Sequence, residues 1–529
     1  MGAEEDVPVL VVGGSLVGTT TALLLGLHGV ESLVVERHSG GAIHPRAALI
    51  LQRSMEIIRG AGLEEQVRGS SYAQFEPDGA IMSVETLAGK ELAWHIPKLN
   101  EGVRDVSPSE RLFVTQIGLE PLLRARAQER GARVRFGTEL VEIEQDADGV
   151  SSVVRDRESG RLTTVRSAYV VAADGPRSPV RERLGIGMRG RGVFSKAITI
   201  YFRADVGSLL RGRNLSVVLV MNDVFAGFFR IEKPYRSGFL VVHSVGDPAS
   251  PVTDVWDLDE QRCVELVHAG LGTDEIDVEI DDVMRWQAMA DVAERFQDGR
   301  IFLAGDAAHV MPPYGGYGGN TGIQDAHNLA WKLALTLQGR AGPELPATYE
   351  AERRPTALFV TEQAYARYVT RAAPYLAGGG MAPIVGDLEI DLGTRVRSAA
   401  VLLEDPDDES VHVDPRASCG APGTRAPHLW LGQDGGAPST LDLVAGDVTL
   451  LVAPDGRAWL DAARDAGVTV HRVSSPAFAD SYGITATGAA LVRPDGVVAW
   501  RAADDDAASA EALRSVLDAI LCRAAHPVV

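Results

Sequence analysis

A glycine-rich turn near the amino terminus has the residue types and the spacing of a pyrophosphate site. Residues 7–12 form a short apolar run, the turn GGSLVG runs from Gly13 to Gly18, and residues 16–27 show helical spacing. Glycine permits a tight turn, and the backbone amides at the start of the helix attract a phosphate group. Glu36 ends the next apolar run, where a carboxylate bonds ribose hydroxyls and disfavours a 2′-phosphate. The alternative is a strand-turn-helix unit without a ligand.

A second segment combines an aspartate with a tight turn. Residues 172–181 read AADGPRSPVR and follow an apolar strand that ends at Val171. Asp174 and Gly175 either form a turn capped by Ser178 before a short helix, or contribute a carboxylate to a ligand site. The residues alone leave both interpretations open.

The longest signature lies between residues 300 and 337. Residues 300–309 read RIFLAGDAAH and predict a strand that ends before Asp306. A carboxylate at the carboxyl end of a parallel strand lies where α/β sheets bind ligands. Residues 312–320 form a glycine-rich loop before a helix from 321 to 337, so bare backbone amides can stabilise negative charge there. A flexible lid with capping residues is the alternative.

The order of apolar segments predicts an α/β protein with an inserted sheet. Residues 7–35 form a strand-helix-strand unit, and the pattern weakens between residues 75 and 103. Between residues 184 and 282, several β-like runs follow one another without long helices, which indicates an antiparallel sheet. Helix returns after Gly319, and short strands alternate with helices from residue 414 onward.

Composition narrows the class of protein. The chain has 529 residues, 45% of them hydrophobic and 23% charged, with a net charge of −21, which is typical of a globular protein and works against nucleic acid binding. The apolar run from residue 9 to 27 is broken by glycine, serine and threonine, so no membrane span or signal peptide is expected. We expect a cytoplasmic protein without disulfides or a metal site, because no C-x-x-C pair occurs among Cys263, Cys419 and Cys522.

Together these segments resemble the para-hydroxybenzoate hydroxylase-like flavoprotein monooxygenases over most of residues 7–360. The resemblance depends on the order and spacing of GGSLVG, Glu36-Arg37, His44-Pro45-Arg46-Ala47, Arg53-Ser54-Met55-Glu56, Gln116 with Leu119-Glu120, Asp174-Gly175, GDAAH, PPYGGYGGN, residues 325–332 and residues 349–355. The C-terminal part resembles the thioredoxin-like tail of bacterial aromatic polyketide hydroxylases at residues 423–428, 439–443, 482–483 and 491–501. The absence of a cysteine pair excludes dithiol chemistry there and leaves a structural or dimer-related role.

The resemblance implies a discontinuous domain organisation. A Rossmann-type FAD-binding domain is expected at residues 1–75, 104–183 and 283–370, an inserted antiparallel-sheet substrate domain at 76–103 and 184–282, a helical linker at 371–413, and a thioredoxin-like domain at 414–529.

The resemblance also implies an FAD site. Glu36 is expected to hold the ribose, Asp306 the ribityl chain, and the Asp174 motif both FAD and a passing nicotinamide nucleotide. For Arg37 and Arg46, the alternative is that each is a solvated or ion-paired surface arginine without a role in FAD binding. The full set of expected FAD contacts is Gly13, Ser15 in place of the usual second glycine, Leu16, Val17, Gly18, Glu36, Arg37, Arg46, Gln116, Asp174, Asp306, Pro313, Gly316, Gly318, Gly319 and Asn320.

The implied reaction is hydroxylation of a polycyclic aromatic, polyketide-type substrate. NADPH or NADH delivers hydride to the flavin, O2 adds at flavin C4a to give a hydroperoxide, and the protein keeps water away. No second dinucleotide motif occurs in the sequence, which agrees with transient binding of the nicotinamide. The alternatives are Baeyer-Villiger or drug-inactivating oxygenation on the same scaffold, or an FAD-binding protein or reductase that does not activate O2.

The residues that act on the substrate are less defined by sequence. The hypothetical proton-transfer groups are Tyr317, His44, His243 and Arg46. Alternate residues of the inserted sheet face either the substrate or the core, and the named positions are Tyr201, Met221, Phe229 and His243. The oligomeric state is expected to be a monomer or a homodimer.

Overall fold

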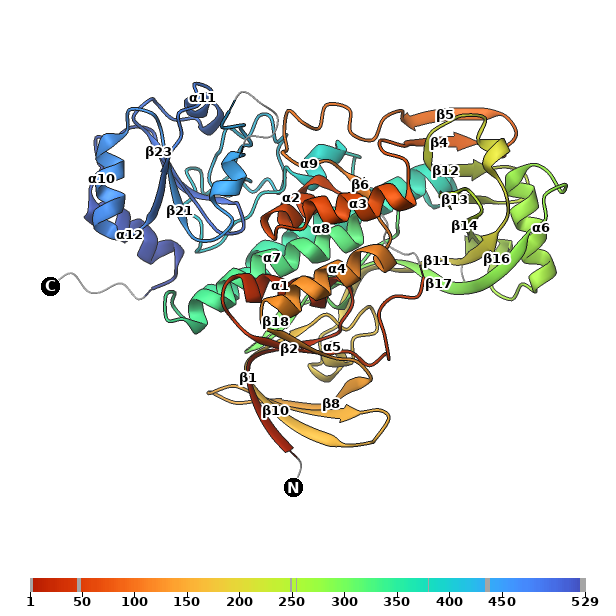
Figure 1. The fold of residues 1–529 in the computed structure, drawn as a ribbon, viewed down its shortest axis with the longest axis horizontal. Coiled ribbons are helices and arrows are strands. Elements are labelled where there is room, and N and C mark those ends of the chain that lie inside the picture. Colours follow the sequence, from red (N-terminus) through yellow and green to blue (C-terminus); the bar gives the residue numbers. More distant parts are fainter. Residues whose placement is uncertain are drawn as a thin grey trace.

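Two eight-stranded sheets and one four-stranded sheet form the three parts of the protein, and two long helices run between them. The structure is a computed structural model and describes residues 3–44, 49–247, 250–253, 255–378, 380–432 and 438–523. In Figure 1, α7 (Tyr317–Leu337) and α8 (Thr348–Ala372) cross the middle of the molecule, with the C-terminal part at one end and the second eight-stranded sheet at the other.

The first sheet has a parallel centre. Its order is β18-β19-β10-β1-β2-β7, and β9 and β8 extend from β10. Its strands are β1 (Ala3–Val12), β2 (Ser32–Val35), β7 (Ala132–Arg135), β8 (Thr138–Gln145), β9 (Val150–Asp156), β10 (Leu162–Ala172), β18 (Gln297–Asp298) and β19 (Ile301–Leu303). Because central parallel strands are covered on both faces, Val9, Leu10 and Val11 are fully buried.

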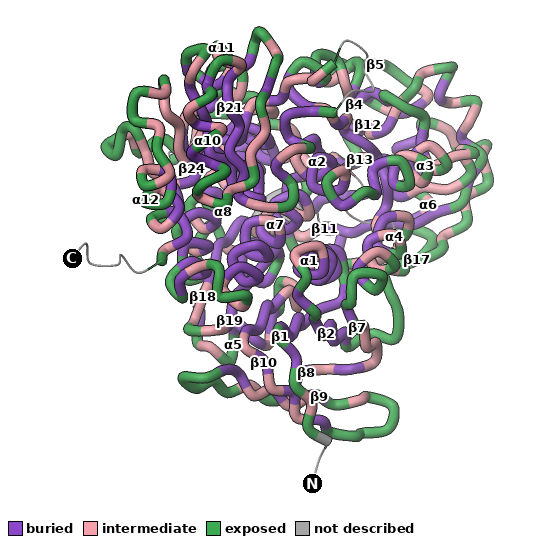
Figure 2. The backbone as a smooth tube through the Cα atoms, turned by 60° about the vertical axis from the view of Figure 1, so that its left-hand side comes forward, coloured by how far each residue is buried: buried purple, intermediate pink, exposed green. Residues whose placement is uncertain are grey.

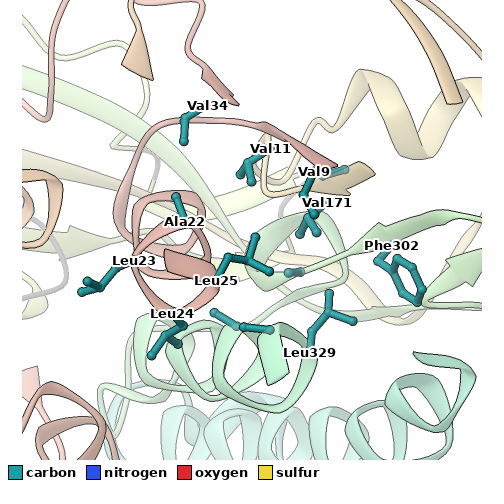
Figure 3. Packing of buried hydrophobic residues seen from close by; sticks show 14 of the residues in the cluster. Val9, Val11, Ala22, Leu23, Leu24, Leu25, Val34, Val171, Phe302 and Leu329 are labelled. Atoms are coloured by element: carbon teal, nitrogen blue, oxygen red, sulfur yellow. The ribbon is translucent and has the colours of Figure 1, made fainter. Parts of the chain in front are cut away.

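Helices cover this parallel centre. Side chains of α1 (Leu16–Leu27) and α7 form one cluster with those of the strands, as Figure 3 shows for Leu25, Leu329 and Val171. Figure 2 shows most of α7 as buried chain. The remaining elements of this part are α2 (Gln52–Gly60), α3 (Glu64–Gln74), α4 (Gln116–Glu129), α5 (Pro179–Arg183), β3 (Leu49–Ile50) and β6 (Leu112–Phe113).

The second sheet has the order β20-β17-β11-β14-β13-β12-β4-β5. Its strands are β4 (Ala80–Val84), β5 (Glu91–Ile96), β11 (Met188–Arg203), β12 (Leu215–Met221), β13 (Ala226–Glu232), β14 (Ser237–His243), β17 (Glu279–Ala293) and β20 (His309–Val310). It is antiparallel except where β12 meets β4 in parallel, so residues 80–96 and 188–293 build one sheet. The single strand β17 runs across the expected boundary at residue 282 and connects this sheet to the first.

The two faces of the second sheet differ. One face packs against α6 (Glu260–Leu271) through a cluster that includes Ile200, Phe229 and Val242. The opposite face carries aromatic side chains, among them Tyr201 and Phe239. A short separate hairpin, β15 (Val245–Asp247) with β16 (Ser250–Thr253), accompanies the sheet.

The expected helical linker contains little helix. After α8 ends at Ala372, the described residues up to 413 contain only η4 (Pro374–Leu376) and α9 (Asp387–Asp391) as helical elements. Prolines at 374, 383 and 406 and glycines at 378, 386 and 393 interrupt any longer helix in this segment. The segment is therefore an irregular connection rather than a helical one.

The C-terminal part is a small α/β unit. Its sheet has the order β22-β21-β23-β24, in which β21 and β22 are parallel and the other neighbours antiparallel. Its elements are β21 (Thr449–Val452), α10 (Arg457–Ala466), β22 (Thr469–Arg472), α11 (Phe478–Tyr482), β23 (Ala489–Val492), β24 (Val498–Ala502) and α12 (Ala510–Ile520). The predicted mixed α/β fold is confirmed. Across the described parts of all three units, no helix has the length and apolar character needed to cross a membrane.

A buried charge network joins the C-terminal part to the long helices. Lys332 of α7 and Arg493 both donate to the Glu352 carboxylate of α8, at 3.0 Å and 2.7 Å. Arg493 also donates to Asp495, and Asn328 donates to Asp495 at 3.1 Å. Burial lowers the pKa of Lys332 to about 8 although Glu352 raises it. Such a network holds its members in one arrangement, because every charge needs its partner away from water.

Substitution of Arg493 tests this connection. In Arg493→Met, Glu352 and Asp495 lose their shared partner while buried, so the free energy of unfolding should fall by about 3–5 kcal/mol. Arg464→Met is the matched control, because Arg464 forms an exposed pair with Asp461 whose loss costs about 0.5 kcal/mol or less. Urea unfolding followed by tryptophan fluorescence measures both, and equal losses in the two variants would contradict the assigned role of the network.

Candidate functional site

The turn between β1 and α1 has no room for a side chain at Gly13 or Gly18. Gly13 has φ +106°, and a Cβ atom there would lie 2.2 Å from the carbonyl oxygen of Ala173. A Cβ atom on Gly18 would lie 1.8 Å from the carbonyl oxygen of Gly13. Leu16 and Val17 follow as the first residues of α1. The glycines therefore bring the turn against residue 173 and leave the start of α1 as a bare cluster of amides, as a pyrophosphate site requires.

Glu36 is held beside this turn by backbone amides. Its Oε2 accepts from Gly14 N at 2.8 Å and its Oε1 from His38 N at 2.8 Å. The carboxylate is thereby oriented at the end of β2, next to the phosphate-type turn. Arg37 is exposed, and its Nε lies 3.3 Å from the His38 ring.

Ser15 has its own polar partners, which explains how this residue is accommodated in the turn. Its Oγ donates to Glu120 Oε1 at 2.6 Å, and Gln116 Nε2 donates to the same carboxylate oxygen at 3.2 Å. Ala42 N donates to the other oxygen of Glu120 at 3.1 Å. The buried Glu120 thus connects the turn, α4 and the chain before residue 44, a role that sequence reasoning missed. Its place four residues after Gln116 on one helix face was the available signal.

Asp174 lies at the second turn with one carboxylate oxygen unused. Its Oδ2 accepts from Val180 N at 3.1 Å, whereas its buried Oδ1 has no hydrogen-bond partner among the described residues. Burial raises the pKa of this carboxyl. Arg181, which sequence reasoning also missed, donates to Ala307 O at 3.1 Å and to Pro176 O at 3.1 Å. The second and third signatures are therefore tied together.

A buried carboxylate holds the third turn in place. Asp325 accepts from Gly305 N at 3.1 Å, lies 2.7 Å from His309 Nε2 and accepts from Arg353 Nε at 2.8 Å. Burial alone would raise the pKa of Asp325, but the charges of His309 and Arg353 hold it below its usual value. The turn consequently presents Asp306 as an exposed side chain at the end of β19.

The loop before α7 turns sharply at glycines and is anchored by an amide side chain. Gly316 caps α7 with φ +71°. Asn320 accepts from Leu51 N at 2.9 Å and donates to Leu49 O at 2.8 Å and Gly316 O at 2.7 Å. Asn320 thus positions the loop against β3 from a buried site. Pro313 of this loop is exposed, and Gly318 and Gly319, which lie in the first turn of α7 rather than in the loop, are partly exposed.

Tyr317 does not fit the hypothesis of a general base. Its hydroxyl donates to Asp387 Oδ1 at 2.8 Å, and the guanidinium of Arg367 lies over its ring at 5.5 Å. Burial raises the pKa of the phenol well above its usual value, so Tyr317 keeps its proton at neutral pH. Its position at the start of α7 makes it a contact between the helix and residues 387–391 instead.

Histidines and aromatic rings gather on one face of the second sheet. The ring of His44 stacks on Tyr201 at 4.7 Å, and its Nε2 lies 3.1 Å from Asp282 Oδ2. His243 Nε2 lies 3.3 Å from the hydroxyl of Tyr314, and burial lowers the pKa of His243 to about 4. His243 is therefore neutral at pH 7. Arg46 belongs to residues 45–48, which lie outside the described residues.

Of the two remaining expected substrate contacts, Phe229 is not brought to this face, and Met221 lies at the exposed end of β12. Phe229 packs against Phe202 at 5.8 Å and lies close to Gly270 of α6, so it occupies the opposite face. Its neighbour Phe228 occupies the aromatic face and contacts Tyr314. Met221 ends β12 and is 42% exposed. Neighbouring residues of a strand point to opposite faces of the sheet, so an error of one residue assigns a side chain to the wrong face. The sequence-based prediction made this error for Phe229.

Comparison with known protein families shows to which family the chain belongs. The chain matches the family described as FAD binding domain over residues 6–364 and the family described as aromatic-ring hydroxylase, C-terminal, over residues 420–524. The first match alone covers more than half of the chain. The chain belongs to the FAD-binding aromatic-ring hydroxylases.

Relatives of this hydroxylase are similar over their whole length. It is 49% identical to 4-methyl-5-nitrocatechol 5-monooxygenase from a Burkholderia species, with 98% of each chain covered. It is 38% identical to aklavinone 12-hydroxylase from Streptomyces purpurascens, with 98% of this chain and 100% of that one covered. The structure of aklavinone-11 hydroxylase with FAD and aklavinone matches at 36% identity with a TM-score of 0.92, covering 99% and 100% of the two chains. The predicted activity of an FAD-dependent aromatic-ring monooxygenase is confirmed.

The residues of this hydroxylase fit FAD. The glycine turn leaves helix amides accessible, Asp306 is exposed at the end of β19, and Asp174 has a buried oxygen without a partner. These features supply donors for phosphate and acceptors for hydroxyl groups, which are what the pyrophosphate, the ribose and the ribityl chain of FAD require.

Substitution of Gly18 tests the turn. In Gly18→Ala, the new methyl group collides with the carbonyl of Gly13, so α1 must move and affinity for FAD should fall at least about 100-fold. Gly69→Ala is the control, because Gly69 lies in α3 with nothing within 4 Å of its added Cβ. Flavin fluorescence during titration of the apoprotein gives both affinities. Unchanged affinity in Gly18→Ala would contradict the assignment of this turn to FAD.

Proposed function

We propose that this hydroxylase uses NADPH or NADH and O2 to hydroxylate a polycyclic phenol of the polyketide type. The observation that carries the proposal is the aromatic face of the second sheet, which turns Tyr201, Phe228, Phe239 and Trp286 away from α6. Flat aromatic side chains contact fused aromatic rings over a large area. Relatives named for aklavinone and tetracenomycin compounds support the same substrate class.

A single-ring catechol is the second candidate substrate. The Burkholderia relative that shares 49% identity is named for a nitrocatechol, and it covers the same length of chain. Both candidates are electron-rich rings that carry hydroxyl groups, so the same reaction serves either one.

We further propose how the residues hold FAD. The pyrophosphate lies at the start of α1, beside Gly13 and Ser15, and Glu36 holds the adenosine ribose. Asp306 holds the ribityl chain, and residues 313–320, which form the loop and the first turn of α7, border the isoalloxazine. Gln116, Arg37 and Asp174 line the same path, and the order of these residues in the structure supports it: the turn, Glu36, the Asp174 turn and β19 all lie at one edge of the parallel sheet. Ligands of α/β sheets bind at that edge.

The protein's own task is to orient the ring, hold a proton and exclude water. FAD supplies the redox chemistry, as acceptor of a hydride and as the centre that activates O2. His44, stacked on Tyr201 and paired with Asp282, is placed to take the proton of a substrate hydroxyl, because an imidazole oriented by a carboxylate is a common general base. Loss of that proton makes the ring more electron-rich, which favours transfer of oxygen to it. The apolar aromatic face keeps solvent from the reacting atoms.

Isotope incorporation tests the function. Purified FAD-loaded protein supplied with NADPH or NADH, 18O2 and a polycyclic phenol should release a product heavier by one 18O atom, with reductant consumption that depends on the substrate. Mass spectrometry measures the product. Consumption of reductant without oxygen in any aromatic product would overturn the hydroxylase proposal, and a lactone or ring-opened product would point to oxygen insertion instead.

Substitution of His44 tests the proton transfer. In His44→Gln, kcat should fall by about 10²- to 10³-fold while FAD affinity stays unchanged, because a general base typically contributes a factor of this size. His38→Gln is the control, since His38 is exposed beside Arg37 and lies outside the aromatic face. Steady-state oxidation of the reductant coupled to product formation gives kcat. Equal rates for the two variants would exclude His44 as the base.

A further inference from the structure

An arginine lies among the aromatic rings of the second sheet. Arg230 is in β13, two residues after Phe228, so the two side chains share the face opposite α6. Phe229 and Ile231 point to the α6 side. The side chain of Arg230 is buried, with 4% of the residue exposed. A cation therefore stands on the face that we assign to the substrate.

Two phenyl rings flank this guanidinium. Its Cζ lies 4.3 Å from the ring centre of Phe75 and 4.4 Å from that of Phe113. Both rings belong to a small apolar cluster with Leu99. Ring faces attract a cation and shield it from water, but they supply no hydrogen-bond acceptor in the plane of the guanidinium.

The donors of Arg230 lack partners. Its Nε and Nη2 are both buried without a hydrogen-bond partner among the residues that the structure describes. Burial lowers the pKa of Arg230 to about 9, with the Glu232 charge acting in the opposite direction, so the group stays protonated at neutral pH. Buried polar groups are nearly always hydrogen-bonded, and a buried charge without a partner is costly. These two donors therefore have no acceptor among the described residues, and negatively charged oxygen atoms of a bound ligand would satisfy them.

Other arginines of this chain show which acceptor suits the Nε and Nη2 donors, which lie along one edge of the guanidinium. Arg59 donates from Nε and Nη2 to the two oxygens of Asp442, at 2.7 Å and 2.9 Å. Arg501 donates from the same two nitrogens to the two oxygens of Glu404, at 2.6 Å and 2.7 Å. This edge carries two parallel N–H groups, which match a pair of neighbouring oxygens that share a negative charge.

The position of Arg230 connects it to the proposed flavin loop. Phe113, which flanks Arg230, pairs with Leu49 between β6 and β3. The Leu49 side chain lies 3.1 Å from the position that a Cβ on Gly316 would take, and its carbonyl accepts from Asn320. One layer of side chains thus separates Arg230 from the loop expected to border the isoalloxazine.

We propose that Arg230 binds two adjacent oxygen atoms of the aromatic substrate that share a negative charge, as in a catecholate. This inference rests on the proposed function and narrows its substrate class to aromatic compounds with such an oxygen pair. The two N–H groups orient the ring by a bidentate contact, while Phe75 and Phe113 keep water from the charge pair. A carboxylate on the ring offers the same pair of oxygens, and the test separates the two sources.

Binding to the FAD-loaded oxidised enzyme, measured by isothermal titration calorimetry, tests the proposal without turnover. The probes are 4-nitrocatechol, its monomethyl ether at one of the adjacent hydroxyls, and 3-nitrobenzoate. Wild-type enzyme should bind 4-nitrocatechol about 10- to 100-fold more tightly than the ether, because the methyl group hinders one oxygen of the pair and removes its share of the negative charge. Tight binding of the benzoate in place of the catechol would assign the contact to a carboxylate and overturn the catecholate.

Variants of Arg230 complete the test. In Arg230→Met the preference for catechol over ether should disappear, and in Arg230→Lys it should shrink, because lysine keeps the charge but lacks the two-pronged edge. Arg213→Met is the matched control, since Arg213 donates to backbone carbonyls of residues 87 and 209 and should retain the full preference. Equal affinity of wild type for catechol and ether, or an unchanged preference in Arg230→Met, overturns the proposal.

Thermal unfolding separates substrate binding from a structural role. Without ligand, Arg230→Met should melt at the wild-type temperature or above it, because the substitution removes an unpaired buried charge. A lower melting temperature together with an unchanged preference would show a structural cation instead. The hydroxylase proposal is judged separately by 18O incorporation, so absence of hydroxylation with a retained, Arg230-dependent preference would overturn that function and leave this contact standing.

Discussion

The rest of the site depends on the contacts that the buried carboxylate of Asp325 makes. It lies in α7 and joins the Gly305 amide, His309 and Arg353 of α8, all of them away from water. Since a buried carboxylate must keep its partners, the turn that presents Asp306 cannot shift relative to the two long helices. The end of a strand and the start of a helix, separated by a glycine-rich loop, are thereby held in one arrangement.

The helix α7 carries this arrangement to the rest of the molecule. Its start anchors the loop through Asn320, its middle holds Asp325, and its later turns reach the C-terminal part through Asn328 and Lys332. The C-terminal unit is therefore connected through α7 to the glycine-rich loop that precedes this helix. The second sheet separates two environments. Its α6 face is an ordinary core, and its other face carries aromatic rings, His44 and Arg230, whose Nε and Nη2 have no partner among the described residues.

Local geometry explains why the sequence located some of the turns and strand ends correctly. The neighbouring residues set the geometry of the turns and strand ends that contain Gly13, Gly18, Glu36 and Asp306. Glu120 and Arg181 were missed because their partners are distant in sequence: Ser15 and Ala42 for Glu120, and the Ala307 carbonyl for Arg181. Tyr317 was predicted as a base, yet Asp387, seventy residues later, gives it a different role.

The sequence by itself determined the glycine turns, the α/β order, the inserted sheet, the family and the redox cofactor, because each depends on short-range geometry or on motif order. Only the tertiary structure decided which face each strand residue occupies, as Phe228 and Phe229 show. It alone showed that the described part of residues 373–413 contains little helix, and that two buried donors of Arg230 have no partner among the described residues. Burial and pairing depend on segments that meet only after folding. The residues adjacent in sequence therefore do not reveal whether a charged side chain will have a partner.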